Sequence, residues 1–289
     1  MTLKKLSLLS VVLIIAVLFI LPAPARAVEV KIKLYGGYSY LAGGDLNAGT
    51  KGFADLWSEL FTLIGATKSG SFKGAHMGPS FGGDLVLMFS PVIGIGFGSE
   101  YLKASDHPTI TFTDGLATIQ ILPKAEASAV PLNLSLNFCF SGGPGFRVNL
   151  YAGVGYYMAK MLSTWRLQEG TDFIQTESTA KANAIGFHGG LGFEFDLSPN
   201  VALFIEARGR YAKLGGFEGD LTASASGGAS DHASGKLYYW EGLGMTTVFY
   251  PMIQVVPTAP TPSSSTRNVR EAKVDFSGGT ALGGIVIKF

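Results

Sequence analysis

Hydrophobic residues along much of this chain alternate with polar or small residues at a period of two. In residues 28–40, for example, apolar side chains at most even positions alternate with Glu29, Lys31 and Lys33 at odd positions. A period of two is that of a β-strand, whose successive side chains point to opposite faces. The pattern predicts eight strands, each with one apolar face, at residues 28–40, 81–89, 93–101, 132–140, 148–156, 185–195, 201–211 and 281–289.

The connections between these strands alternate between short and long. The short ones are residues 90–91, 141–145 and 198–200. The long ones are residues 42–74, 105–121, 163–180 and 216–271. Such alternation is typical of outer-membrane barrels, which have tight periplasmic turns and longer external loops. The sequence therefore predicts an all-β fold, an eight-stranded antiparallel up-and-down transmembrane β-barrel.

The N-terminus has the layout of a secretory signal peptide. Two lysines precede an apolar run over residues 6–21, and small residues after two prolines offer a cleavage site behind Ala27. The run is sixteen residues long, short for the ~20 that a membrane-spanning helix needs, so an uncleaved anchor is the weaker alternative. No cysteine follows the site, which argues against a lipoprotein. We expect residues 1–27 to be removed and residues 28–289 to form one barrel domain.

Composition narrows the class of protein. Hydrophobic residues make up 47% of the 289 residues but charged residues only 15%, against ~25% in an ordinary soluble domain. A fraction of charged residues this low argues against a disordered chain. The single cysteine, Cys139, excludes a disulfide scaffold and a cysteine-ligated zinc site. A net charge of +1 gives no indication of a nucleic acid partner, and we expect none.

Aromatic residues recur at similar heights on the apolar faces of the predicted strands. Ten strand residues at about 3.3 Å each, tilted roughly 40°, climb about 25 Å, which matches the apolar band of such barrels. These residues would form girdles at the two membrane interfaces, although tyrosine and phenylalanine also favour strands in general. The predicted outer girdle is Tyr38, Tyr101, Tyr156 and Tyr211, and the predicted inner girdle is Phe89, Phe140, Phe195 and Phe289.

By alternation, the opposite faces of the strands line the lumen, and they carry charged residues. Six acids and six bases fall there: Glu29, Lys31, Lys33, Asp84, Glu100, Arg147, Glu194, Asp196, Glu206, Arg208, Arg210 and Lys288. An unpaired charge in a narrow lumen loses hydration worth several kcal/mol, so equal numbers indicate internal pairing. The alternative is that they line a selective pore or a ligand cavity. The predicted ion-pair network comprises Lys31, Lys33, Asp84, Glu100, Arg147, Glu194, Glu206, Arg208 and Arg210.

This pattern resembles that of the small eight-stranded bacterial outer-membrane barrels of the outer-membrane protein A, X and W type. The end of the chain also resembles the insertion signal of that class through Gly284, Ile287 and Phe289, although Leu282 stands where a polar residue is usual. The resemblance implies a location in the outer membrane of a Gram-negative-type cell envelope. It also implies insertion by the barrel assembly machinery.

His232 and Ser234 have the His-x-Ser spacing of outer-membrane lipid A deacylases, which also use an eight-stranded barrel. Those enzymes carry the pair on a strand and follow it with asparagine, whereas here Gly235 follows and residues 224–235 read as a small-residue loop. We therefore expect no enzymatic activity. Histidines in the other loops lack a partner at metal-ligand spacing, so we expect no metal. The absence of a Gly-rich phosphate loop agrees with an expectation of no cofactor.

Two external loops show patterns of their own. In residues 42–74, apolar residues from Phe53 to Ile64 recur at helical spacing, which predicts a short amphipathic helix. We expect it to lie on the outer leaflet and cap the barrel mouth, with contact to a partner as the alternative. In residues 216–271, the segment 237–250 reads as a strand, and we assign it to a hairpin above the membrane.

These features favour a monomeric outer-membrane barrel with a closed, charge-paired lumen and a structural or surface-interaction role through its external loops. Its expected partners are outer-membrane lipids, the barrel assembly machinery during insertion, and an extracellular ligand or surface. A narrow channel for small or hydrophobic solutes is the alternative, and a lipid-modifying outer-membrane enzyme is a weaker one. A wide porin is disfavoured because porins use about 16–18 strands.

Overall fold

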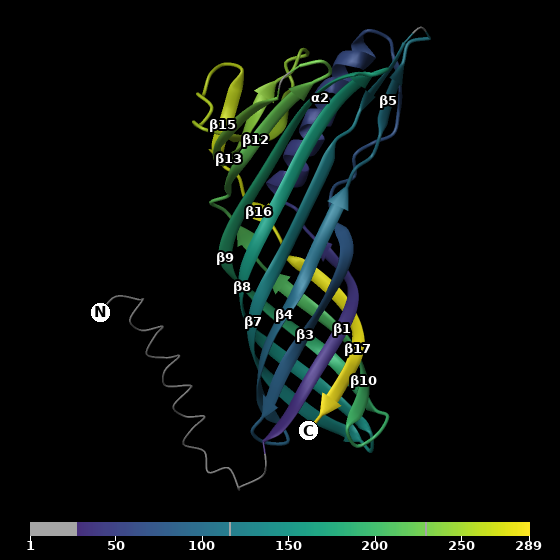
Figure 1. Ribbon diagram of the computed structural model, residues 1–289, viewed down its shortest axis with the longest axis vertical. Coiled ribbons are helices and arrows are strands. Elements are labelled where there is room, and N and C mark those ends of the chain that lie inside the picture. The colour runs from purple at the N-terminus through teal and green to yellow at the C-terminus, as the bar shows by residue number, and fades with distance from the viewer. Residues whose placement is uncertain (1–27, 116, 229) are drawn as a thin grey trace, which may run out of the picture.

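The computed structural model describes residues 28–115, 117–228 and 230–289, which form an elongated molecule (Figure 1). The predicted signal peptide lies outside the described residues. Within those ranges the chain forms seventeen strands and one helix. The helix of the described residues is not long and apolar enough to cross a membrane.

Eight strands of the described chain pair in a closed ring, each antiparallel to its neighbours. Leu34 on the first strand pairs with Ile285 on the last and closes the ring. Closure leaves no strand edge open to lipid, where an unsatisfied backbone group costs several kcal/mol. The ring strands coincide with the eight predicted segments, some of them extended. They are β1 (Glu29–Leu41), β3 (Met77–Met88), β4 (Ile93–Asp106), β7 (Lys124–Gly143), β8 (Phe146–Glu169), β9 (Asp172–Asp196), β10 (Val201–Tyr211) and β17 (Gly278–Lys288).

The ring strands carry apolar side chains on the outside and charged ones in the lumen. Along β10, for example, Leu203, Ile205 and Tyr211 are exposed, whereas Glu206 and Arg208 are buried. An exposed apolar belt of this kind is typical of barrels that face lipid. The period of two in the sequence therefore identified the outer and inner faces.

The aromatic residues of the predicted girdles lie on this outer surface. Tyr101 is half-buried beside Phe81, with ring centroids 5.3 Å apart. The exposed ones are Tyr38, Tyr156, Tyr211, Phe89, Phe140, Phe195 and Phe289. Their depth in the membrane stays a prediction.

Strands β8 and β9 continue beyond the ring and are 24 and 25 residues long. The predicted long loop over residues 163–180 is therefore wrong, because the two strands stay paired as far as Glu169 and Asp172. The upper parts of both strands carry polar pairs such as Thr164 opposite Glu177. An apolar period of two does not mark a strand that stands outside the lipid, so the sequence pattern missed this part.

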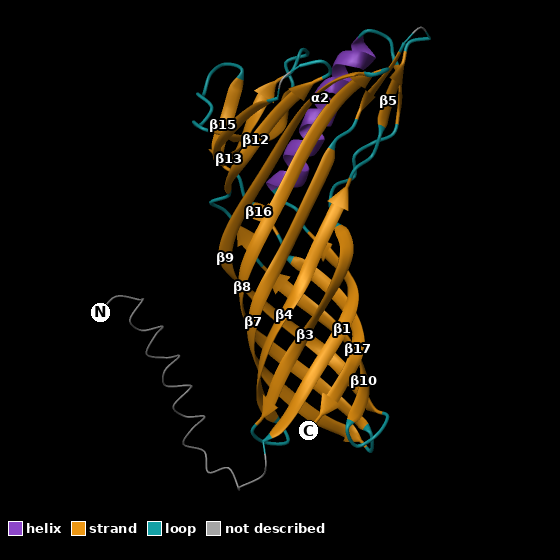
Figure 2. Ribbon diagram, viewed as in Figure 1, coloured by secondary structure: helices purple, strands orange, loops and turns teal. Residues whose placement is uncertain are grey.

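Further strands extend the sheet on both sides of this pair above the ring (Figure 2). They are β2 (Thr67–Ser69), β5 (Ile110–Thr113), β6 (Thr118–Ile121), β12 (Glu218–Ala225), β13 (Asp231–Leu243), β14 (Phe249–Val256) and β15 (Thr266–Glu271). Strands β11 (Lys213–Leu214) and β16 (Val274–Asp275) pair with each other in a separate two-stranded sheet. The expectation of eight strands is thus incomplete for the described chain, since its external loops contain strands as well. Strands β13 and β14 pair as a hairpin, but the segment 237–250, predicted to be a single strand, contains the turn between Leu243 and Phe249.

The helix α2 (Asp45–Leu63) lies above the ring and packs against β8 and β14 (Figure 1). It is longer than predicted. The Phe53 ring stacks on Trp165 with centroids 4.3 Å apart, and the Phe61 ring lies 5.0 Å from that of Phe112. The expectation that the helix lies on the outer leaflet is wrong for Phe53 and Phe61, because these side chains pack against the external sheet. Ile64, at the end of the same apolar stripe, is exposed.

Two glycines let α2 approach β14 closely. A Cβ atom at Gly52 would lie 2.0 Å from the carbonyl oxygen of Pro251, and one at Gly49 would lie 2.5 Å from the side chain of Ile253. Glycine inside a helix costs up to about 1 kcal/mol relative to alanine. Backbone-close packing against β14 explains why the helix contains glycine at both positions.

Candidate functional site

Arg208, on β10, points into the lumen and contacts carboxylates from three strands. Its Nη1 lies 2.9 Å from Glu100 Oε2, and its Nη2 lies 2.9 Å from Glu206 Oε1 and 3.2 Å from Asp84 Oδ2. Arg208, Glu100 and Glu206 are each at most 5% exposed. A guanidinium carries several N–H donors in a fixed plane, so it can serve several carboxylates at once. Arg208 therefore links β3, β4 and β10 across the lumen.

Two further cations complete this group of charges. Lys33 Nζ lies 2.5 Å from Glu206 Oε2, and Arg210 Nη1 lies 3.3 Å from Glu100 Oε1. Arg210 also donates a hydrogen bond of 2.7 Å to Thr280 Oγ1. The formal charges balance, which buried charges require because an unpaired one is costly. The group, here termed the upper cluster, consists of Lys33, Asp84, Glu100, Glu206, Arg208 and Arg210.

Two tyrosine hydroxyls belong to the same hydrogen-bond network. Tyr151 Oη donates to Glu206 Oε1 at 2.5 Å and accepts from Arg208 Nε at 2.6 Å. Tyr35 Oη donates to Asp84 Oδ1 and accepts from Arg208 Nη1, both at 3.1 Å. The predicted network named charged residues alone. The period of two places both tyrosines on the lumen face of their strands.

A second group of charges lies beside the short turns at the other end of the ring. Glu194 Oε1 lies 2.7 Å from Lys288 Nζ and 3.2 Å from Arg147 Nη1, and Glu194 Oε2 lies 3.6 Å from Lys31 Nζ. Asp196 pairs with both Arg147 and Lys288. The group, here termed the lower cluster, consists of Glu29, Lys31, Arg147, Glu194, Asp196 and Lys288, and its formal charges also balance.

The nine residues predicted to form one network therefore divide between two clusters, with Lys31, Arg147 and Glu194 in the lower one. Among the described residues, no ion pair joins the two clusters. Apolar side chains share the lumen with them, since Phe204, Leu282 and Val286 are all buried there. Lys33 Nζ lies 4.3 Å from the centroid of the Phe204 ring. These apolar groups occupy space that a continuous chain of ion pairs would need.

The end of the chain is paired in the ring. The Phe289 amide donates a 2.9 Å hydrogen bond to the carbonyl oxygen of Val30, while the Phe289 side chain is exposed. A Cβ atom at Gly284 would lie 2.0 Å from the carbonyl oxygen of Leu34. Leu282, the departure from the usual insertion signal, is buried with the apolar groups of the lumen.

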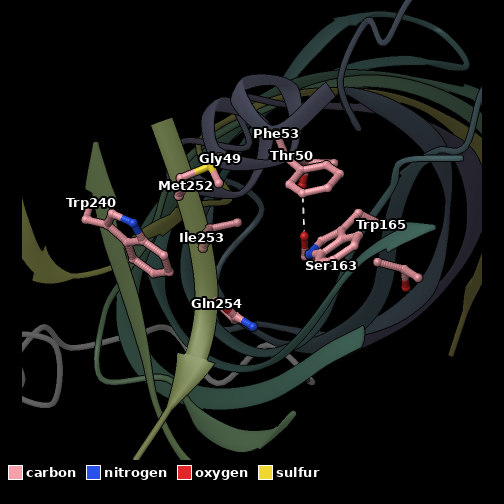
Figure 3. A pocket seen from close by; sticks show the side chains of 10 residues that line it. Gly49, Thr50, Phe53, Ser163, Trp165, Trp240, Met252, Ile253 and Gln254 are labelled. Atoms are coloured by element: carbon pink, nitrogen blue, oxygen red, sulfur yellow. Dashed lines mark hydrogen bonds between the residues drawn. The ribbon is translucent and has the colours of Figure 1, made fainter. Parts of the chain in front are cut away.

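A small cavity lies above the lumen, between α2, β8, β13 and β14 (Figure 3). Its volume is about 70 Å³, and its walls include Phe53, Trp165 and Met252. Thr50 Oγ1 and Ser163 Oγ form a 3.0 Å hydrogen bond across it, drawn as a dashed line in Figure 3. Pockets for drug-sized ligands are about 300–1,000 Å³. The cavity therefore has room for water rather than for an organic ligand.

An apolar groove of about 280 Å³ lies between the second half of α2 and the turn that joins β13 to β14. Leu63, Ile64 and Met245 nearby are exposed, Met245 to 70%. Contiguous exposed apolar surface commonly marks a site of interaction. This surface, here termed the tip groove, is lined by Leu56, Trp57, Leu60, Leu243, Gly244 and Met245.

His232 and Ser234 lie on β13 and not in a loop as predicted. His232 is paired with Thr222 and Ser234 with Asp220 in the ladder that joins β12 and β13. His232 Nδ1 lies 3.1 Å from Thr222 Oγ1, and Ser234 Oγ donates to Asp220 Oδ1 at 2.7 Å. Within the described part of the chain, His232 and Ser234 do not hydrogen-bond to each other. Each is bound instead to β12.

No curated protein matches the sequence. The outer membrane protein OprG from Pseudomonas aeruginosa is similar, with 12% identity, 91% of this chain and 97% of that chain covered, and a TM-score of 0.36. CarO2 of Acinetobacter baumannii has 12% identity, 91% and 100% coverage and a TM-score of 0.35. The outer membrane protease OmpT from Escherichia coli has 10% identity, 91% and 96% coverage and a TM-score of 0.31.

A protein-family model also matches the chain. The family described as outer membrane protein beta-barrel domain matches residues 11–233, more than half of the chain. The closed antiparallel ring with its apolar outer surface agrees with that description. The chain belongs to the outer membrane protein beta-barrel domain family and is a protein of the bacterial outer membrane.

Proposed function

We propose that this protein is a non-conducting, non-catalytic outer-membrane barrel that carries a folded extension for contact with a ligand or surface outside the cell. The observation that carries the proposal is Arg208, which contacts Asp84, Glu100 and Glu206 in the lumen. An eight-stranded barrel encloses a space only just wide enough for side chains to fill it. Long charged side chains that are paired across such a space leave little room for a continuous path of water.

Both charge clusters and the apolar side chains of the lumen support a closed lumen. The upper cluster and the lower cluster are each balanced in charge, and apolar side chains including Phe204 and Val286 are buried in the same lumen. Opening a path would separate ion pairs in a low-dielectric space, which is strongly unfavourable. A barrel of this kind serves better as an anchor than as a channel.

The extension supports the interaction part of the proposal. Helix α2 and the external strands share one apolar core, which includes Phe61, Phe112 and Leu237. A packed core holds the tip groove in a defined shape, and preorganised surfaces bind with a smaller entropic cost. The tip groove is the surface on which we expect contacts with an extracellular partner.

Conductance in planar bilayers tests the closed lumen. The wild-type protein should show at most brief, small current events, and the same should hold for Lys68→Ala, which removes an exposed lysine of β2. A steady open-channel current from the wild-type protein would overturn the proposal. That result would favour the narrow channel for small or hydrophobic solutes instead.

A further inference from the structure

Four lysines and one acid lie along one row of the sheet, just above the ring. Register places Lys103 opposite Ser128, Ser128 opposite Lys160, and Lys160 opposite Lys181. Glu218 on β12 continues the row beside Lys181 and is followed by Lys236 on β13. Lys103, Lys160 and Lys181 lie on the outward face of the sheet, because they are in phase with the exposed apolar residues lower on the same strands. Glu218 and Lys236 are exposed and share this face, because residues directly opposite each other on paired strands point to the same side. The row is rich in positive charge.

The four lysines differ in whether a carboxylate lies near the ammonium group. Lys103 Nζ pairs with Glu126 at 3.0 Å, and Lys236 Nζ pairs with Glu271 at 2.8 Å. Lys160 and Lys181 are both exposed, and among the described residues no carboxylate lies within ion-pair distance of either ammonium. Like charges directly opposite on neighbouring strands are destabilising. An anion held between the two lysines would reverse this repulsion.

The surface directly below the pair is apolar. A groove of about 280 Å³ runs from Lys160 and Lys181 down to Val130, Met158 and Tyr101. Met158 is 40% exposed. Lower on the same strands the outward surface continues with the exposed residues Leu132, Tyr156 and Ile185. Cationic groups above and apolar groups below match an amphiphile with an anionic head and hydrocarbon chains.

We propose that Lys160 and Lys181 bind the phosphate of a phosphorylated lipid of the outer leaflet, whose acyl chains lie along Val130, Met158 and Tyr156. Lysines placed next to a membrane interface attract anionic lipid headgroups, and the flexible lysine stem lets the ammonium reach the headgroup level. Tyr156 lies four residues below Lys160 on β8, so the lysines stand just outside the level of the predicted tyrosine girdle. The binding site does not depend on whether the lumen conducts.

Native mass spectrometry of the full protein, released from detergent, tests the proposal with defined lipids. The probes are diphosphorylated lipid A and the same lipid A with both phosphates removed. The wild-type protein should retain the diphosphorylated lipid and bind the dephosphorylated one much more weakly. The double variant Lys160→Gln, Lys181→Gln should raise the apparent Kd for the diphosphorylated lipid by about 30-fold, the combined effect of two basic groups near an anionic lipid.

Two controls separate this site from general charge effects. The double variant Lys51→Gln, Lys68→Gln removes the same charge at exposed positions of α2 and β2 and should bind as the wild type does. The double variant Lys160→Arg, Lys181→Arg keeps the charge and should retain binding. Heat-modifiable migration on a gel verifies that each variant is folded.

Three outcomes would overturn the proposal. One is equal affinity of the wild type and the Lys160→Gln, Lys181→Gln variant for the diphosphorylated lipid. Another is equal binding of the phosphorylated and dephosphorylated lipids. The third is complete displacement of the lipid by millimolar inorganic phosphate, which would indicate a site for a free anion and not for a lipid.

Discussion

Arg208 and Glu206 lie two residues apart on β10, and Arg208 Nη2 contacts Glu206 Oε1 at 2.9 Å inside the lumen. Residues two apart on a strand share a face, so this pair forms within one element. The contacts of Arg208 with Asp84 and Glu100 instead join strands that are more than 100 residues away in the chain. One side chain thus connects a local ion pair to the closure of the whole ring.

Arg208→Ala should lower the free energy of unfolding by about 3–5 kcal/mol, because it leaves several carboxylates buried without their cation. Urea titration in lipid vesicles, followed by gel mobility, measures this change. The matched control is Arg267→Ala. It removes the ion pair between Arg267 and Glu241, in which the Arg267 side chain is 55% exposed. The control should change the free energy of unfolding by no more than about 1 kcal/mol. Equal urea midpoints for Arg208→Ala and the wild type would contradict the structural role of the upper cluster.

Tyr151→Phe should destabilise the barrel by about 1–3 kcal/mol, since it removes a hydroxyl that bridges buried Glu206 and Arg208. In a Glu206→Gln background the same substitution should cost less, because the strongest acceptor of the hydroxyl is then gone. The same urea titration measures both. Tyr211→Phe, at an exposed position, is the control and should have little effect. Additive effects of Tyr151→Phe and Glu206→Gln would show that the two side chains act independently.

Gly52→Val should loosen the external extension and leave the ring intact, because a side chain there collides with Pro251 on β14. Limited proteolysis of the folded protein should cut the extension of this variant faster than that of the wild type. Lys51→Ala, which changes an exposed neighbour on the same helix, should be protected like the wild type.

Replacement of residues 50–68 by a short Gly/Ser loop should likewise preserve heat-modifiable migration, since the closed ring does not include α2. It should also expose β14 to protease, because the helix forms part of the core of the extension. A variant that no longer shows heat-modifiable migration would mean that the ring depends on the helix. Normal protease resistance would mean that the fold of the extension does not depend on the helix.

Deletion of Phe289 should reduce assembly in the outer membrane while export and removal of the predicted signal peptide proceed. Phe289 ends the sequence that resembles an insertion signal, and its amide pairs with Val30 next to the seam of the ring. Quantitative immunoblotting of outer-membrane fractions under native expression measures the effect. Phe289→Tyr, which keeps an aromatic terminus, should assemble normally. Wild-type levels of the deletion variant would refute the prediction.

The sequence by itself determined the strands that face lipid and the side of each strand that lines the lumen. Lipid requires an apolar outer face, and the alternation of side chains along a strand turns that requirement into a period of two that can be read directly. Both Arg208 and Glu206 were placed in the lumen on this basis. The short and long connections likewise indicated the up-and-down order of the strands.

The tertiary structure alone decided which lumen residues meet. Alternation identifies the face of a residue but not its height or its direction around the ring, and these depend on the register between strands. Register separates Lys31 from Lys33 into different clusters and brings Lys160 opposite Lys181. The external strands and the place of α2 also depend on long-range packing. Outside the lipid the outer face of a strand does not have to be apolar, so apart from residues 237–250 the sequence pattern did not reveal these strands.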